Sequence, residues 1–317
     1  MKKLAKAVGA IVLLVAVLVL VFRTPDTDPV KMRAKYGAAP SQFVEIDGQT
    51  VHLRDEGPRN APVIVLLHGS NADLHTWQPW VDRLKTQYRV IRFDQIGHGL
   101  TGPAGDGDYS RGAFAADVEA VAAHFGLSRF VLAGNSLGGG IALEYAQVYP
   151  SRLSGLVLVD PSGAPNKEMA QGNLAFTLAG LPVVNQLFTQ ITPRSIVEDS
   201  LRSSVSNQAI VTPAAIDRYW ELARIPGNRA AMLTRFAEPR APLEKAEVAT
   251  IRVPTLVMWG EEDSLIPFSS AGWFVNAIPD AELVSYSGIG HLPMEEAPDA
   301  TAADLKDWMV NSALTNE

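Results

Sequence analysis

Apolar runs of strand length alternate with helical patterns along most of the chain. Five runs are almost continuously apolar, as expected for strands covered on both faces: Pro62–Gly69, Tyr88–Asp94, Arg129–Gly134, Leu153–Asp160 and Val253–Gly260. Helical patterns lie between them, for example at Tyr109–Gly126 and Leu137–Tyr149. This alternation predicts an α/β fold with a doubly wound, mostly parallel sheet.

Two segments depart from this alternation. Residues 43–57 alternate apolar and polar positions around an Asp-Gly pair, which predicts a β-hairpin. Residues 163–250 contain no run of the buried-strand kind and are interrupted by prolines, which predicts a helical cap inserted into the sheet domain. The predicted core is therefore split into residues 41–162 and 251–317.

The N-terminal segment is uncharged and apolar from Ala7 to Phe22. A helix of this length spans about 24 Å at ~1.5 Å per residue. This is shorter than a ~30 Å hydrocarbon core, and flanking Lys6 and Arg23 can reach outward to cover part of the difference. We expect residues 1–23 to form an uncleaved membrane anchor. The alternatives are a buried helix and a cleaved signal peptide, although no convincing small-residue cleavage site follows.

Charge around this segment bears on its orientation. Lysines at the extreme N-terminus favour a cytoplasmic N-terminus and an extracytoplasmic folded domain, periplasmic in a bacterium. Arg23, Lys31, Arg33 and Lys35 follow within the same window and weaken the asymmetry. Residues 24–40 are polar and proline-rich, which predicts a linker between anchor and core.

Composition narrows the chemistry. The 317 residues include no cysteine, which excludes disulfides, thiolate metal sites and a cysteine nucleophile. A net charge of −7 argues against nucleic acid as a partner, because such binding needs a basic surface.

A serine stands at the end of one predicted buried strand, just before a predicted helix. The local sequence is Gly134-Asn135-Ser136-Leu137-Gly138. Ligands and chemistry collect at the carboxyl ends of parallel strands, and a helix N-terminus favours negative charge. Small flanking residues permit a tight turn that exposes the hydroxyl. The corner therefore predicts a serine nucleophile and a site that stabilises an anion.

A serine nucleophile needs a base and a group that orients the base. His291 follows a short strand-like run and a glycine-bracketed turn, and Asp263 lies beyond the run that ends at Gly260. We predict that these two residues complete a triad with Ser136. Asp160 also ends a strand and is the alternative acid.

We expect several other titratable residues to have structural rather than catalytic roles. His68 is expected to shape a loop, and His52 is expected at the surface. Glu295 and Glu296 are expected to cap the final helix, where carboxylates interact well with the helix dipole.

Five motifs occur in the order found in a known family: LLHGSN (66–71), FDQIGHGLTG (93–102), GNSLGG (134–139), GEEDSLIP (260–267) and GHLPMEEAP (290–298). From Ser41 to about Ser312 the chain resembles the α/β-hydrolases with a helical cap. The resemblance implies an oxyanion hole formed by the backbone N–H of Leu137 and of Ser70, with Asn71 as the alternative. Serine at position 136 argues against the branches that carry an aspartate nucleophile. No metal and no cofactor are implied.

These features predict a membrane-anchored serine hydrolase that cleaves an ester-type bond in a largely apolar small-molecule or lipid-like substrate. The alternatives are a lactonase, a C–C bond hydrolase and a non-catalytic ligand-binding member. A C–C bond hydrolase would need a polar or cationic pocket for a dienoate carboxylate, for which Arg202, Arg218 and Arg235 are candidates.

Overall fold

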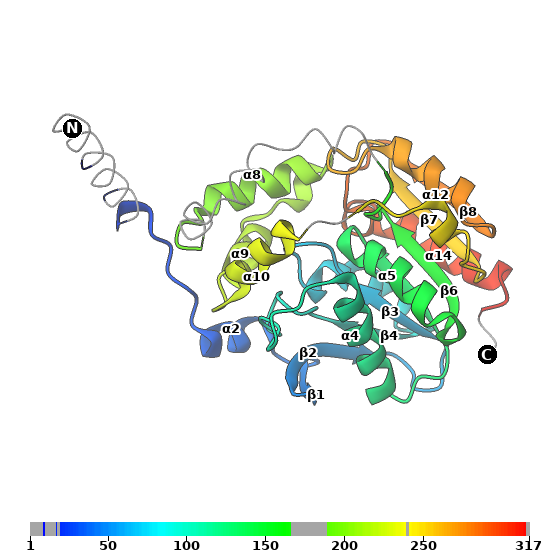
Figure 1. Cartoon of the computed structure of the whole chain (residues 1–317), viewed down its shortest axis with the longest axis horizontal. Coiled ribbons are helices and arrows are strands. Elements are labelled where there is room, and N and C mark those ends of the chain that lie inside the picture. The colour runs from blue at the N-terminus through cyan, green and yellow to red at the C-terminus, as the bar shows by residue number, and fades with distance from the viewer. Residues whose placement is uncertain (1–8, 10–16, 18–19, 166–188, 239–240, 315–317) are drawn as a thin grey trace.

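The computed structural model describes residues 9, 17, 20–165, 189–238 and 241–314 (Figure 1). In this part of the chain, eight strands form one sheet in the order β1-β2-β4-β3-β5-β6-β7-β8. Their bounds are β1 Gln42–Ile46, β2 Gln49–Glu56, β3 Val63–Leu67, β4 Arg89–Phe93, β5 Phe130–Asn135, β6 Leu153–Val159, β7 Thr255–Gly260 and β8 Ala281–Tyr286. The pairs from β4 to β8 are parallel, and β2 is antiparallel to both β1 and β4. The predicted α/β fold is confirmed.

Helices cover both faces of the sheet. Alternate residues of β3 enter different cores: Val65 and Leu67 pack with α4 (Arg111–His124), α5 (Leu137–Val148) and α12 (Ala271–Ala277). Ile64 and Leu66 pack with α3 (Gln78–Leu84) and α14 (Pro298–Asn311) on the other face. Burial on both faces explains why the central strands are apolar runs rather than alternating patterns.

The predicted hairpin joins β1 and β2. Asp47 and Gly48 form its turn, and both have positive φ angles, 49° and 82°. Two consecutive residues in this region are typical of a type I′ turn, which suits the twist of paired strands.

One surface prediction is wrong. His52 on β2 is fully buried. Its Nδ1 lies 2.7 Å from Asp94 Oδ2, and its Nε2 lies 2.8 Å from Ser41 Oγ. Strand β2 lies between β1 and β4 and is covered on both faces, so the alternation of its sequence does not mark an exposed side.

Helices occupy most of the described part of residues 163–250. They are α8 (Arg194–Ser204), α9 (Pro213–Ala223), α10 (Asn228–Ala237) and the short α11 (Lys245–Val248). Figure 1 shows α8, α9 and α10 grouped on the side of the molecule that also carries the N-terminal segment. Residues 166–188 and 239–240 of the predicted cap lie outside the described residues.

The predicted linker contains a helix. Asp28 accepts hydrogen bonds from the N–H groups of Val30 and Lys31 and caps α2 (Pro29–Tyr36). An aspartate followed by proline is a strong helix start, because Pro is favoured in the first turn. Met32 packs with Leu222 and Ile225, so this segment lies against the α9–α10 region.

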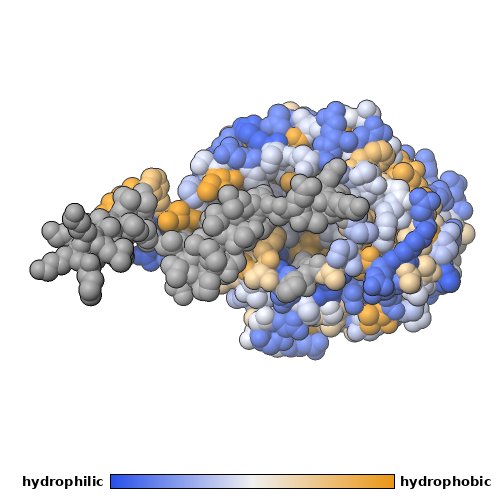
Figure 2. Space-filling view, turned by 45° about the horizontal axis from the view of Figure 1, so that its top comes forward, coloured by the Kyte–Doolittle hydropathy of each residue, from blue (hydrophilic) through white to orange (hydrophobic). Residues whose placement is uncertain are grey.

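Most of the predicted anchor (residues 1–8, 10–16 and 18–19) lies outside the described residues. Among the residues that are described, no helix has the length and apolar character needed to cross a membrane. Leu20, Val21 and Phe22 are described and exposed. Figure 2 shows apolar surface on the described residues at this end of the molecule, and both polar and apolar surface on the body.

Candidate active site

Ser136 occupies the sharp turn between β5 and α5. Its backbone has φ 54° and ψ −116°, a conformation that is costly for a residue with a Cβ. Three backbone hydrogen bonds hold it: the Ser136 N–H donates to Val159 O at 3.0 Å, and Ser136 O accepts from the N–H groups of Ser162 and Gly140 at 3.0 and 3.1 Å. The surrounding strands therefore impose a strained geometry that places this serine at the carboxyl edge of the sheet.

Glycine is required at positions around the turn because other backbone atoms lie too close to leave room for a Cβ. A Cβ at Gly134 would overlap the carbonyl of Gly138, and one at Gly138 would overlap the carbonyl of Leu67. A Cβ at Gly69 would lie 3.2 Å from Ser136 Cβ, so the loop after β3 rests directly against the serine.

This loop carries the expected oxyanion donors. Ser70 and Asn71 follow Gly69, and Asn71 has a positive φ of 60°. His68 supports the loop: its Nδ1 is 2.8 Å from Gly69 O, and its Nε2 accepts from Gln95 N–H at 3.1 Å. Burial lowers the pKa of His68, which favours the neutral ring that this bonding needs. On the other side of Ser136, Leu137 begins α5 and presents an N–H of its first turn.

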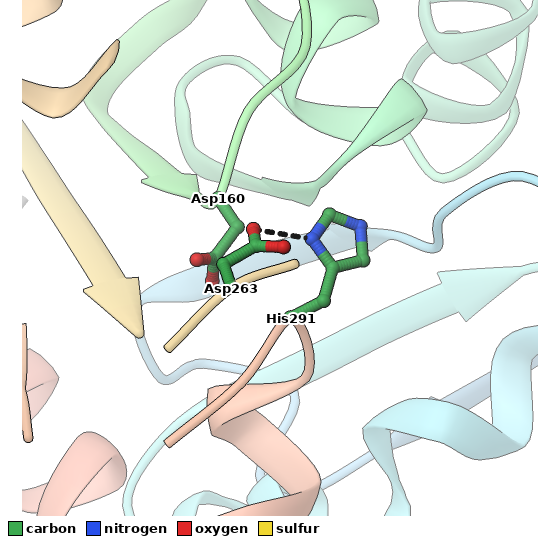
Figure 3. A group of neighbouring side chains, drawn as sticks. All are labelled: Asp160, Asp263 and His291. Carbon is green, nitrogen blue, oxygen red and sulfur yellow. Dashed lines mark hydrogen bonds and ion pairs between the residues drawn. The ribbon is translucent and has the colours of Figure 1, made fainter. Parts of the chain in front are cut away.

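His291 and Asp263 meet at the same edge of the sheet (Figure 3). The His291 Nδ1 lies 2.6 Å from Asp263 Oδ2, and both side chains are buried. Asp263 Oδ1 accepts from the N–H groups of Leu265 and Ile266 at 2.7 and 3.0 Å. The carboxylate is thus held by three donors and fixes the orientation of the imidazole.

Asn135 links the serine turn to the histidine loop. Its Nδ2 donates to His291 O at 3.1 Å and to Val159 O at 3.2 Å. Sequence reasoning assigns no role to Asn135, and its position directly before Ser136 is the only signal in the sequence that points to it.

The role of Glu296 differs from the expected one, which is to cap the final helix. The end of the chain is divided at Pro298 into α13 (Pro293–Glu296) and α14, and Glu296 ends the first of these helices. Its Oε1 accepts from the N–H groups of Gly290 and Leu292 at 3.0 and 3.4 Å. Its Oε2 accepts from Ser206 and Asn207 N–H, both at 2.8 Å. Glu296 therefore joins the His291 loop to the segment after α8.

The three candidate arginines have different surroundings. Arg202 is exposed and pairs with Glu198 at 2.8 Å, while Arg218 lies 3.2 Å from Asp73. Arg235 on α10 is buried and donates to Asn71 Oδ1 at 3.2 Å. Arg218 and Arg235 both contact the loop after β3, and Arg235 contacts Asn71, one of the expected oxyanion residues.

Arg235 also contacts His98 beside a small cavity of about 20 Å³, which Asn71 and Met232 help to line. Burial, together with the nearby guanidinium, lowers the pKa of His98 well below its usual value. The arginine therefore faces a neutral imidazole.

Among the described residues, Asp160, Asp263 and His291 are the acidic and histidine side chains close enough together to hold a metal ion, with ligand atoms within 4.8 Å of one another. Two of the possible ligand atoms, His291 Nδ1 and Asp263 Oδ2, are already engaged in the hydrogen bond between these residues. A carboxylate bound to Nδ1 of a histidine is an arrangement that orients an imidazole as a base, and Asn135 connects the His291 loop to the turn that carries Ser136.

Residues 62–298 match the model of the alpha/beta hydrolase fold family. The chain belongs to this family and is a hydrolase of that fold. It is 27% identical over 288 residues to the 2-hydroxy-6-oxononadienedioate/2-hydroxy-6-oxononatrienedioate hydrolase of Comamonas testosteroni. The matched region covers 86% of this chain and 96% of the relative. It is 26% identical over 273 residues to a bifunctional esterase/perhydrolase of Acinetobacter calcoaceticus, with 79% and 93% covered. Among solved structures it is similar to a membrane phospholipase A, with a TM-score of 0.77, 25% identity and 99% of each chain covered.

Proposed function

We propose that this protein is a membrane-anchored serine hydrolase that cleaves a carboxylic ester bond in a largely apolar, lipid-like substrate. The observation that carries the proposal is the His291–Asp263 pair, with its 2.6 Å bond, at the sheet edge where Ser136 is held at positive φ. Esterase and phospholipase relatives support an ester as the bond that is cleaved.

In the proposed reaction, Ser136 Oγ attacks the carbonyl carbon while His291 Nε2 takes its proton. Asp263 keeps the proton of the neutral ring on Nδ1 and stabilises the imidazolium. The N–H groups of Leu137 and of Ser70 or Asn71 bind the oxyanion, and one such donor contributes about 3–4 kcal/mol. His291 then protonates the leaving alcohol and activates water, which hydrolyses the acyl-enzyme.

Membrane attachment is part of the proposal. The uncharged segment from Ala7 to Phe22 supports it, as does the likeness to a membrane phospholipase A over 99% of both chains. We place the catalytic domain on the extracytoplasmic side. Protease digestion of intact and permeabilised cells tests this placement: digestion of the domain only after the inner membrane is opened contradicts it.

C–C bond hydrolysis is the second candidate. Arg235 favours it, because a buried guanidinium bound to Asn71 beside the expected oxyanion loop suits a substrate carboxylate. The relative from Comamonas testosteroni is named for such a dienedioate substrate.

The first test is labelling with a fluorophosphonate, which reacts with activated serines. We expect the wild-type protein to take the label and Ser136→Ala to lose it, while Ser128→Ala, at an exposed serine, labels like wild type. Turnover of a panel of esters, lactones and dienoate ketones then separates the two candidate reactions. A folded wild-type protein that neither labels nor hydrolyses any ester contradicts the proposal.

A further inference from the structure

Asp160 is a second buried carboxyl group next to the His291–Asp263 pair. It follows β6, is 0% exposed and has a positive φ of 44°. Its Oδ1 accepts from Gly260 N–H at 3.0 Å. Its Oδ2 is buried without a hydrogen-bond partner in the described part of the chain. Figure 3 shows Asp160 beside Asp263, on the side away from the imidazole.

Two adjacent buried carboxyl groups cannot both carry a charge, because like charges in a low-dielectric site repel strongly. The donors decide which of them is ionised. Asp263 receives three, from His291 Nδ1 and from the N–H groups of Leu265 and Ile266. Asp160 receives one, from Gly260 N–H. The negative charge therefore belongs on Asp263 and the proton on Asp160.

The other groups that face Asp160 do not supply a counter-charge. Glu296 is itself an acid, bound to backbone N–H groups, and Tyr286 donates its hydroxyl to Asp304 at 2.8 Å. Burial, followed by the nearby Asp263, raises the pKa of Asp160 well above its usual range.

We propose that Asp160 stays a neutral carboxylic acid at working pH and donates its Oδ2–H to the Asp263 carboxylate, acting as a positioning residue for the histidine. This inference rests on the proposed serine-hydrolase function. The hydrogen bond satisfies the buried Oδ2 and anchors Asp263 from the side opposite His291. The same hydrogen bond draws part of the negative charge of Asp263 toward the proton of Asp160. This limits how strongly Asp263 stabilises the imidazolium of His291. Asp160 is thus a support for the acid rather than an alternative acid.

Asp160→Asn is the deciding variant. An amide keeps an acceptor for Gly260 N–H and an N–H donor for Asp263, and it is neutral as the proposed acid is. We expect kcat/KM within about threefold of wild type, an unmoved acidic limb of the pH profile and a similar Tm. If Asp160 were ionised, the same variant would remove a negative charge beside His291 and move the acidic limb to lower pH.

Asp160→Leu tests the positioning role. Without the donor, the charge of Asp263 acts undiminished on the imidazolium, so the acidic limb moves to higher pH. Loss of the anchor also lowers kcat by about tenfold, as expected for one hydrogen bond to a charged group. Wild-type kcat and pH profile in a folded Asp160→Leu protein would overturn the positioning role. If Asp160→Leu does not fold, the pH profile of Asp160→Asn and the infrared band of the protonated carboxyl group decide whether Asp160 has this role.

Infrared spectroscopy of protein with isotope-labelled aspartate gives a readout that is independent of activity. Burial also raises the pKa of Asp117, to about 7, so the measurement is made in protein that carries Asp117→Asn. We expect a C=O band of a protonated carboxylic acid at neutral pH, lost when Asp160→Asn is added. The band should be retained in Glu262→Gln, which removes an exposed charge from the Asp263 loop. A shifted acidic limb, a lost fold or an unchanged spectrum in Asp160→Asn overturns the inference. Absence of fluorophosphonate labelling in wild type instead overturns the proposed function, so the two failures are distinguishable.

Discussion

At the scale of single residues, Asp117 on α4 is a carboxylate in an unfavourable place. Its Oδ2 is buried without a hydrogen-bond partner in the described part of the chain, close to a small cavity that Asp47 also lines. Burial, and then repulsion by Asp106, Asp47 and Asp108, raises its pKa to about 7. Folding therefore opposes the ionisation of this side chain near neutral pH.

Asp117→Asn should stabilise the protein, increasingly so at higher pH. In the unfolded chain an aspartate ionises near pH ~3.9, whereas in the fold Asp117 ionises near pH 7. The wild-type free energy of unfolding thus falls as pH rises between these values and stays lowered above them. We expect the variant to gain a few degrees in Tm at pH 8 and less at pH 5.

Thermal melting at both pH values checks this prediction. Asp199→Asn, at an exposed position, is the matched control and should show no pH-dependent gain. A gain that is equal at both pH values, or no gain at pH 8, would show that Asp117 is not the destabilising group.

At the scale of elements, the loop that carries His291 is built together with the segment after α8. The His291 N–H donates to Ser204 O at 2.8 Å, and Glu296 binds N–H groups on both sides of this junction. A Cβ at Gly290 would lie within 3.0 Å of Ser204 O and Val205 Cα, so the two backbones are in contact. We therefore expect a displacement of the end of α8 to shift the His291 loop as well.

Glu296→Gln should lower kcat by at least about tenfold, because an amide nitrogen replaces one acceptor oxygen and leaves two backbone N–H groups without a partner. Steady-state kinetics and the rate of fluorophosphonate labelling measure this effect. Glu119→Gln is the control, since Glu119 binds Tyr145 and Arg152 in another part of the molecule. Turnover within twofold of wild type in Glu296→Gln would contradict the role of this carboxylate.

At the scale of the whole molecule, residues 24–36, here called the strap, bind the cap helices. Arg229 Nη1 donates to Thr24 O at 2.8 Å, and its Nη2 pairs with Asp26 at 2.6 Å. Farther along, Glu221 on α9 accepts from Lys35 at 2.6 Å and from Tyr36 OH at 2.7 Å. The strap begins two residues after the predicted apolar segment ends, so a membrane anchor there would be connected closely to the cap.

Shortening the chain tests the importance of the strap. A protein that begins at Thr24 keeps these contacts and should melt close to the full-length protein in detergent. One that begins at Ser41 should melt several degrees lower, and amide hydrogens of α9 and α10 should exchange faster, because Arg229 and Glu221 lose their partners. Equal Tm and equal exchange in the two shortened proteins would show that the strap contributes nothing to the cap.

Much of the fold could be predicted because its signals are local. Runs such as Leu153–Asp160 are apolar because both faces of the strand are buried, and the Asp47-Gly48 turn needs positive φ at both residues. Ser136 was recognisable from neighbours whose small size the tight turn demands. The positions of Asp263 and His291 after strand-like runs predicted that they lie at the same sheet edge as Ser136, and the structure brings these two residues together. Their catalytic roles remain predictions.

Other features depend on contacts between distant parts of the chain, which no local pattern encodes. His52 is buried because β2 is an inner strand, and Glu296 meets Ser206 because the cap returns to the core beside the histidine loop. The sequence by itself determined the strands, the serine turn and a choice of two acids. Only the tertiary structure shows which of the two acids lies against His291, because folding brings two backbone N–H donors and the imidazole to Asp263.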